Sequence, residues 1–306
     1  MSSATIVLLF AVLALILVGF GAIVGYLVGD LLVIMSLFFV LAIGLNIFSY
    51  YKSDYLTIKM TRTKIIERED NPRFYDLVKK VADMAGLPMP RVGIMNSPSP
   101  NAFATGRDKN HAVVVATGSI LAMLNDDEME AVLGHEINHI THRDILVSSV
   151  AATMATIISY IGNIILFSEL FGGINNRNGN TTILLIVSAI LIPLGATFVR
   201  LGISRSRELY ADIGSVRLVR KPDELISSLQ KISKPVVNSA KRGPFGMGMP
   251  KPTGEMGQNS QGAAYSSLFI VNNLNGSALL NLFSTHPTLE KRVAAILAEK
   301  QAIGMY

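Results

Sequence analysis

The chain has 306 residues, half of them hydrophobic and only 16% charged, whereas an ordinary soluble domain carries about 25% charged residues. Its net charge is +5, but no basic and aromatic platform of the kind that binds nucleic acid is present. We therefore expect the excess charge to face anionic lipid. The absence of cysteine excludes disulfide bonds and thiolate metal ligands, and it fits a reducing compartment.

Four long stretches contain no charged side chain, namely residues 1–29, 31–51, 145–168 and 178–199. About 20 helical residues cross a hydrocarbon core of roughly 30 Å, so we predict four transmembrane helices. A cleaved signal peptide is the alternative for the first stretch, but no basic segment precedes its apolar run and a second stretch follows at once. For the last two stretches, the alternative to transmembrane helices is that they are buried helices in the core of a soluble domain.

Lysine and arginine gather at one end of the predicted spans. Five of them follow the second stretch and Arg143 precedes the third, whereas the opposite turns contain Arg177 with two acidic residues. The positive-inside rule then places both termini and the segment before the third stretch in the cytoplasm. We predict a multi-pass protein of the cell membrane, in contact with the lipid bilayer.

The predicted spans divide the chain into four parts. Residues 1–51 form two transmembrane helices, and residues 145–203 form a transmembrane hairpin of two more. Residues 52–144 and 204–306 are cytoplasmic. The fold class is a mainly α membrane protein, of the α+β type, with four transmembrane helices and a cytoplasmic domain.

The first cytoplasmic part contains a helix, three short strands and a second helix. Asn71 and Pro72 start the first helix, because Asn caps helices and Pro is favoured at their first position. Arg91–Met95, Ala102–Thr105 and Ala112–Ala116 are β-type runs separated by turns. They predict a small antiparallel sheet.

The second helix carries the sequence HEINH, the most informative motif of the chain. His135 and His139 lie one turn apart on one helical face, the spacing that a single Zn²⁺ requires. Glu136 lies beside them, where it can accept a proton from water. This pattern has only three fixed positions, so its context must support the interpretation.

A catalytic zinc site needs a third protein ligand. His142 is nearest in sequence, but about 10 Å of helical rise separates it from His135 and no glycine breaks the helix before it. Glu208 is the better candidate, since the predicted hairpin returns the chain to the membrane surface just before it. Asp212 would then accept a hydrogen bond from a ligand imidazole. On spacing alone, both acids could equally well pair with arginines on a solvated face.

Four motifs occur in order: NAFATG at 101–106, GHEINH at 134–139, ELYAD at 208–212 and FSTHP at 283–287. Together with the four predicted spans they resemble the HtpX family of integral-membrane zinc metalloproteases, over nearly the whole chain. The resemblance implies a zincin-like protease domain with one Zn²⁺ per chain. It also implies that His135, His139 and Glu208 are the ligands and that Glu136 is the catalytic base.

By the same resemblance, NAFATG matches the family's edge strand, which pairs with an extended substrate. The residues concerned are Asn101, Ala102, Phe103 and Ala104. An ordinary turn and strand is the alternative. His286 would lie near the site, donating to the oxyanion or organising the loop before the last helix. Residues 243–262, rich in glycine and methionine, would form a flexible loop or a lid over the substrate.

These observations predict a membrane-bound zinc endopeptidase. The resemblance implies that its substrates are misfolded or damaged membrane and cytoplasmic proteins. One alternative is processing of a defined membrane-associated substrate, as in the related prenyl-protein proteases, although four spans are too few for their larger membrane chamber. The other is a zinc-binding scaffold without turnover, which would have no need of Glu136. The expected partners are polypeptides and lipid, not nucleic acid, and no oligomeric state is predicted.

Overall fold

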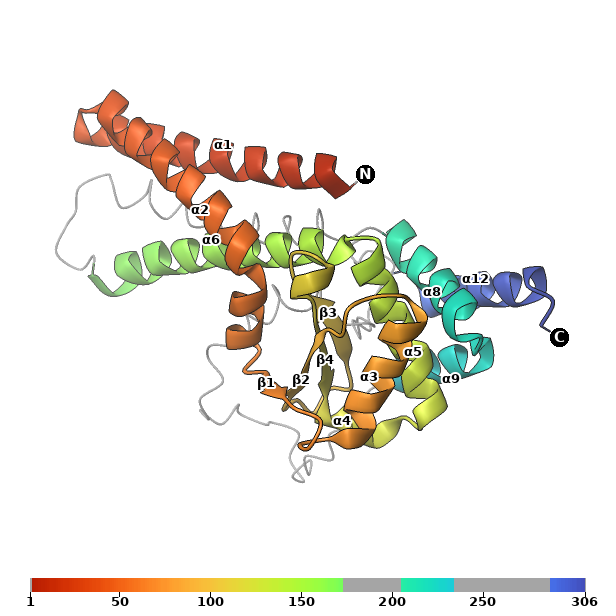
Figure 1. The fold of residues 1–306 in the computed structure, drawn as a ribbon. Coiled ribbons are helices and arrows are strands. Elements are labelled where there is room, and N and C mark those ends of the chain that lie inside the picture. Colours follow the sequence, from red (N-terminus) through yellow and green to blue (C-terminus); the bar gives the residue numbers. More distant parts are fainter. Residues whose placement is uncertain (1, 173–204, 234–286, 306) are drawn as a thin grey trace, which may run out of the picture.

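The computed structural model of the chain describes residues 2–172, 205–233 and 287–305. Long apolar helices lie on one side, and a body built from a sheet and shorter helices lies on the other (Figure 1). Helix α1 spans Ser2–Val28, α2 spans Leu31–Met60 and α6 spans Asp144–Gly172. The start of α1, the end of α2 and the start of α6 all lie towards the body, so one end of the three helices adjoins it.

Two of the described helices, Ala4–Tyr26 and Leu31–Met60, are long and apolar enough to cross a membrane. They agree with the first two predicted spans. The third predicted span lies within α6, in which Asp144–Ala155 forms a shorter apolar helix. The fourth, residues 178–199, lies outside the described residues. Four spans therefore remain a prediction.

The three apolar helices share a core that is separate from the core of the body. It contains Leu9 and Leu13 of α1, Ala42 of α2 and Met154 of α6. Many other large apolar side chains of α1 and α2 point outward, such as Leu32, which is 77% exposed. Outward apolar faces of this size are typical of contact with lipid.

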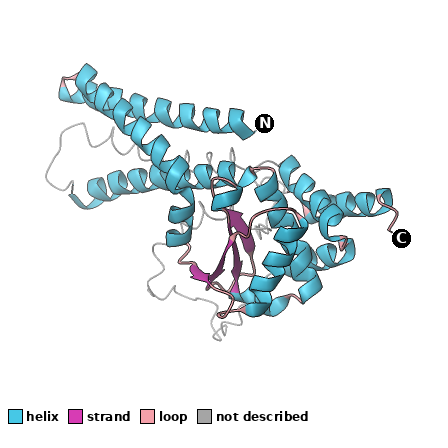
Figure 2. Ribbon diagram, viewed as in Figure 1, coloured by secondary structure: helices cyan, strands magenta, loops and turns pink. Residues whose placement is uncertain are grey.

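The sheet has four strands in the order β1-β2-β4-β3 (Figure 2). The strands are β1 (Lys64–Ile66), β2 (Arg91–Met95), β3 (Ala102–Thr105) and β4 (Val113–Thr117). The outer pairs are antiparallel, but β2 and β4 are parallel, so the prediction of an antiparallel sheet is wrong. Successive strands β2, β3 and β4 do reverse direction, but β4 lies between β2 and β3 instead of outside β3, so it runs parallel to β2.

Helices cover both faces of the sheet. On one face, α3 (Pro72–Met84) and α5 (Asp126–Thr141) build the main core, and Asn71 caps α3 as predicted. On the other face, Ile58 near the end of α2 packs in a small cluster with Phe103 and Val115. The sheet is thus attached directly to the second apolar helix.

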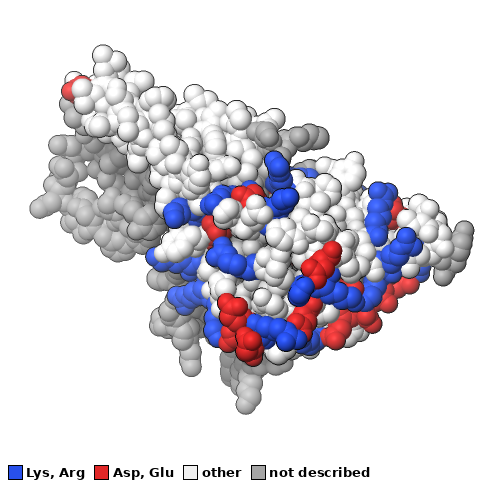
Figure 3. Space-filling model, in the orientation of Figure 1, with Lys and Arg blue, Asp and Glu red and all other residues white. Residues whose placement is uncertain are grey.

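The later part of the chain adds three helices to the described body: α8 (Arg205–Val219), α9 (Pro222–Ile232) and α12 (Leu289–Ala302). Both α8 and α9 contact α5, and α12 contacts α8 and α9. A short helix, α4 (Gly118–Met123), follows β4. Charged side chains gather over the body, while the visible surface of α1 and the adjoining part of α2 is almost free of them (Figure 3).

Helices α5 and α8 cross in close contact because glycine lies at the crossing on each helix. A Cβ added at Gly214 would lie 2.1 Å from Oδ1 of Asn138, and one at Gly134 would lie 2.6 Å from Oγ of Ser215. The Asn138 amide donates to the Gly134 carbonyl at 2.8 Å, and Ser215 Oγ donates to the Ala131 carbonyl at 2.6 Å. This close contact brings the acidic residues of α8 to the histidines of α5.

The start of α5 is held by a buried carboxylate. Glu128 and Asn125 form a capping box, and Lys231 and Ser227 of the α9 segment also donate to the Glu128 carboxylate. Burial alone would raise the pKa of Glu128, but these donors outweigh it and hold the pKa below its usual value. A depressed pKa stabilises the fold above the unfolded-state pKa, and this stability is lost as the pH falls through the folded-state pKa.

Replacing Glu128 with Gln is therefore expected to lower the free energy of unfolding by about 1–3 kcal/mol at pH 7. The difference from the parent should shrink as the pH falls from about 4 through the lowered folded-state pKa, because the parent carboxylate then becomes protonated as well. Thermal unfolding in detergent across a pH series measures it. Glu69→Gln, at an exposed position, is the control, with an expected change within about 0.5 kcal/mol. A Glu128→Gln deficit that persists unchanged at pH 3 would contradict the explanation.

Candidate metal centre

Helix α5 positions two imidazoles on one face, as the spacing of HEINH predicts. The Nε2 atoms of His135 and His139 are 3.2 Å apart. Glu208 reaches them from α8, with one carboxylate oxygen 3.7 Å from Nε2 of His135 and the other 3.6 Å from Nε2 of His139. The structure thus brings together three residues from two helices that are distant in the sequence.

The chemistry and spacing of these atoms fit a metal ion. One donor atom from each of the three residues lies within 4.8 Å of the others. Two imidazole nitrogens and one carboxylate oxygen are a ligand set that zinc uses in catalytic sites, with bonds of about 2.0–2.2 Å. Side chains 3.2–3.7 Å apart can all contact one ion at that length. The three residues therefore form a candidate metal centre.

A buried ionic network lies behind His135. Asp212, which is completely buried on α8, has Oδ1 2.9 Å from Nδ1 of His135. Arg292 of α12 donates to both oxygens of Asp212, from Nε at 2.7 Å and from Nη2 at 2.6 Å. The contact of Asp212 with a ligand imidazole was expected from the sequence, whereas Arg292 was not predicted. The available signal was spacing: Arg292 shares the buried face of α12 with Ile296 and Glu299.

Buried acids dominate the electrostatics of the centre. Burial alone would lower the pKa of His135, but the hydrogen bond and charge of Asp212, together with Glu208, raise it to about 10. For Asp212, the charge and hydrogen bonds of Arg292 outweigh the effect of burial and lower the pKa. Burial raises the pKa of Glu136. The carboxylates that favour a proton on His135 also favour a metal cation.

Glu136 is buried beside the two histidines and faces the sheet. Its Oε2 accepts a hydrogen bond from the Ala104 backbone N–H at 2.9 Å. Strand β3 is the terminal strand of the sheet order, and residues Asn101 to Ala104 are all buried. Backbone groups of an antiparallel strand alternate between its two sides, so Ala102 and Ala104 direct theirs to the same side. The strand that matches NAFATG therefore lies against the candidate base.

His142 lies apart from this cluster. Helix α5 ends at Thr141, Arg143 adopts a left-handed φ of 60°, and α6 starts at Asp144. Helix α5 is thus unbroken before His142, which is its C-cap, and the turn at Arg143 follows His142 and does not bring it to the metal centre. Its Nδ1 donates to the Asn138 carbonyl at 2.9 Å.

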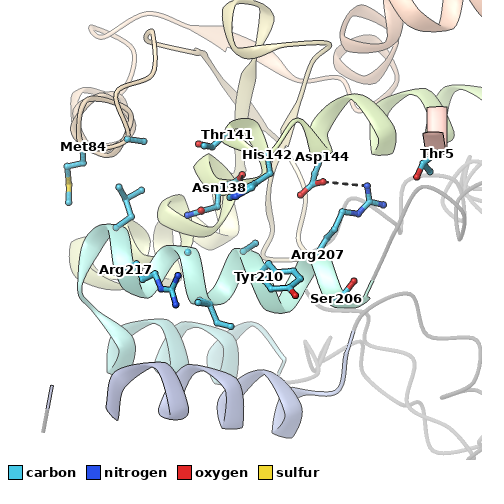
Figure 4. Close-up of a pocket in the computed structure, with 15 residues that line it drawn as sticks. Thr5, Met84, Asn138, Thr141, His142, Asp144, Ser206, Arg207, Tyr210 and Arg217 are labelled. Atoms are coloured by element: carbon cyan, nitrogen blue, oxygen red, sulfur yellow. Dashed lines mark hydrogen bonds and ion pairs between the residues drawn. The ribbon is translucent and has the colours of Figure 1, made fainter. Parts of the chain in front are cut away.

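His142 instead lines a cavity of about 920 Å³ on the other side of α8 (Figure 4). Tyr210 and Arg217 line the same cavity, and an ion pair of 3.5 Å between Arg207 and Asp144 lies at one end of it. Two faces of helix α8 therefore differ in their surroundings, because Glu208 and Asp212 face the metal centre and Tyr210 faces the cavity. His286 and residues 243–262 lie outside the described residues.

An apolar helical anchor joined to a body with an HExxH helix and a third, acidic ligand candidate defines a membrane metalloprotease. Comparison with known proteins agrees. The chain belongs to peptidase family M48, whose family model matches residues 68–300. The resemblance to HtpX proteases that the four motifs indicate is confirmed by curated relatives.

A protease HtpX homolog of Paraburkholderia phytofirmans is 40% identical over 265 residues, which are 86% of this chain and 86% of that protein. A second, from Pelotomaculum thermopropionicum, is 38% identical over 301 residues, 97% of this chain and 99% of that protein. Among solved structures, S. mikatae Ste24p matches with a TM-score of 0.47 and 18% identity, over 95% of this chain and 63% of that one.

Proposed function

We propose that this metalloprotease is a zinc-dependent endopeptidase with one Zn²⁺ per chain, held by His135, His139 and Glu208. The observation that carries the proposal is the convergence of these three side chains, with Glu136 buried beside them. Two imidazoles and a carboxylate favour zinc over the hard cations Mg²⁺ and Ca²⁺, which prefer all-oxygen sites.

Zinc, when bound, supplies a Lewis acid that activates water and polarises the scissile carbonyl. The residues of the chain do the rest. Glu136 accepts the proton of the attacking water at its carboxylate and delivers it to the leaving amine, and its burial beside the two histidines places it for both transfers. Asp212 accepts from Nδ1 of His135, which fixes the tautomer that leaves Nε2 free as a ligand.

The substrate in this proposal is an extended polypeptide. Its binding site is the segment of Asn101, Ala102, Phe103 and Ala104, in which the backbone groups of Ala102 and Ala104 that face away from β4 pair with the peptide and require little of its sequence. The hydrogen bond from the Ala104 N–H to Glu136 supports this placement, because it shows that this side of β3 adjoins the candidate base. From the family resemblance, His286 donates to the oxyanion as the carbonyl is attacked.

We further propose a multi-pass protein with four spans, with both termini and the metal centre in the cytoplasm of the cell. The end of the apolar helices that adjoins the body is also the end where the sequence concentrates lysine and arginine. A protease at this position would meet misfolded or damaged membrane and cytoplasmic proteins, so protein quality control is the role that fits.

Removal of the metal tests the proposal. Full-length protein in detergent should lose cleavage of a labelled unfolded protein by at least about 100-fold after treatment with a chelator. One equivalent of Zn²⁺ per chain should restore it and Mg²⁺ should not, since the ligands include two imidazoles. Full cleavage by metal-free protein would contradict the proposal. Stoichiometric zinc binding without any cleavage would favour the scaffold instead.

A further inference from the structure

We propose that Arg292 is a positioning residue of the metal centre, which fixes the carboxylate of Asp212 and through it the His135 ring. The proposal rests on the assignment of His135 as a metal ligand. Arg292 belongs to the C-terminal helix α12, so the proposal makes correct docking of that helix a condition for metal binding.

The contact between Arg292 and Asp212 is bidentate. Nε of Arg292 donates to Oδ2 of Asp212 at 2.7 Å and Nη2 donates to Oδ1 at 2.6 Å. Two parallel bonds of this kind hold the planes of guanidinium and carboxylate together, which a single bond would not do. Because Asp212 cannot then rotate about its last side-chain bond, Oδ1 stays directed at Nδ1 of His135, 2.9 Å away. Nη2 of Arg292 also lies 3.4 Å from the same Nδ1, a longer contact than either bond to Asp212.

The ion pair of Arg292 and Asp212 is buried, so the fold is destabilised if only one of the two charges is present. Arg292 is 2% exposed and Asp212 is fully buried. Removing one member of a buried pair leaves an uncompensated charge and destabilises the fold, whereas well-packed apolar residues in place of both would serve stability at least as well. A buried pair directly behind a ligand candidate is therefore better explained by orientation of His135 than by stability.

Docking of α12 has other sources of stability. Ile296 is completely buried in the main core, and Arg217 of α8 forms two hydrogen bonds with Glu299. Lys300 pairs with Asp223 of α9. Since these contacts attach α12 to both neighbouring helices, loss of Arg292 need not release the helix. The Arg217–Glu299 pair supplies a matched control, because it joins the same two helices as Arg292 and Asp212.

Zinc affinity tests the proposal without relying on turnover. We would measure it by competition with a fluorescent chelator for the parent, Arg292→Met, Asp212→Asn and the double variant. Each single variant is expected to bind zinc about 10–100-fold more weakly. The double variant should bind zinc nearly as tightly as Asp212→Asn, because Arg292 acts mainly through Asp212 and its own contact with His135 is a long one of 3.4 Å. Arg217→Met should keep parent affinity, even where its thermal unfolding temperature falls.

Measurements of kcat and KM distinguish a positioning role of Arg292 from a role in substrate binding. In Arg292→Met saturated with zinc, kcat should fall at least tenfold while KM for an unfolded protein stays near the parent value. Parent zinc affinity in folded Arg292→Met would overturn the proposal, as would losses that add fully in the double variant. If Arg292→Met does not fold, Arg292→Gln, which keeps one donor towards Asp212, is measured in the same way, with parent affinity overturning the proposal. A failure of peptide hydrolysis as the proposed function would leave these affinities unchanged.

Discussion

Peptide hydrolysis by the Glu136→Gln variant is expected to fall on the order of a thousandfold or more, with zinc still bound at one ion per chain. Gln has the size and shape of Glu, and its side-chain oxygen can still accept the hydrogen bond from the Ala104 N–H. It cannot accept a proton from water. The variant keeps all three proposed ligands, so its zinc content should stay at the parent value while its activity falls.

Glu130→Gln is the matched control. Glu130 is also a buried carboxylate of α5, but Lys80 and Lys221 pair with it away from the metal centre. Its replacement should lower stability while leaving the cleavage rate of the folded protein near that of the parent. Cleavage of an unfolded protein and zinc content would be measured on the same preparations. Undiminished cleavage by Glu136→Gln would remove Glu136 from the mechanism.

Local signals in the sequence predicted the elements that carry the site. The cap at Asn71 and the acidic start of α5 gave both helices at nearly their observed bounds. Helical spacing alone brought His135 and His139 to one face. These predictions succeed because capping and periodicity act over a few residues.

Contacts between distant segments could not be predicted in the same way. The parallel pairing of β2 with β4 depends on the strand order, in which β4 is inserted between β2 and β3, and the order of strands has no local signal. The left-handed turn at Arg143 has no local signal, since non-glycine residues rarely adopt a positive φ. Arg292 escaped notice because an arginine in a helix is usually exposed, and only the fold places Asp212 opposite it.

Glu208 stands between these two cases. From sequence spacing alone, Glu208 could equally well have been a metal ligand or a member of an ion pair on a solvated face. The family resemblance favoured the metal ligand. The close crossing of α5 and α8, allowed by Gly134 and Gly214, supplies the physical reason that Glu208 reaches the histidines. A site assembled across this crossing is complete only when α8 is in place, so metal binding should report on the fold of the whole body.

Glu208→Ala is accordingly expected to weaken zinc binding by more than the roughly 10–100-fold that is typical for loss of an outer hydrogen-bonding partner. The variant loses one of three protein ligands, and two imidazoles alone hold zinc weakly. His142→Ala is the control, because His142 contacts the Asn138 carbonyl and lines the cavity on the other side of α8. Chelator competition should show parent affinity for His142→Ala. The reverse result would make His142 the third ligand, which would require the junction of α5 and α6 at Arg143 to rearrange so that His142 turns to the face of His135.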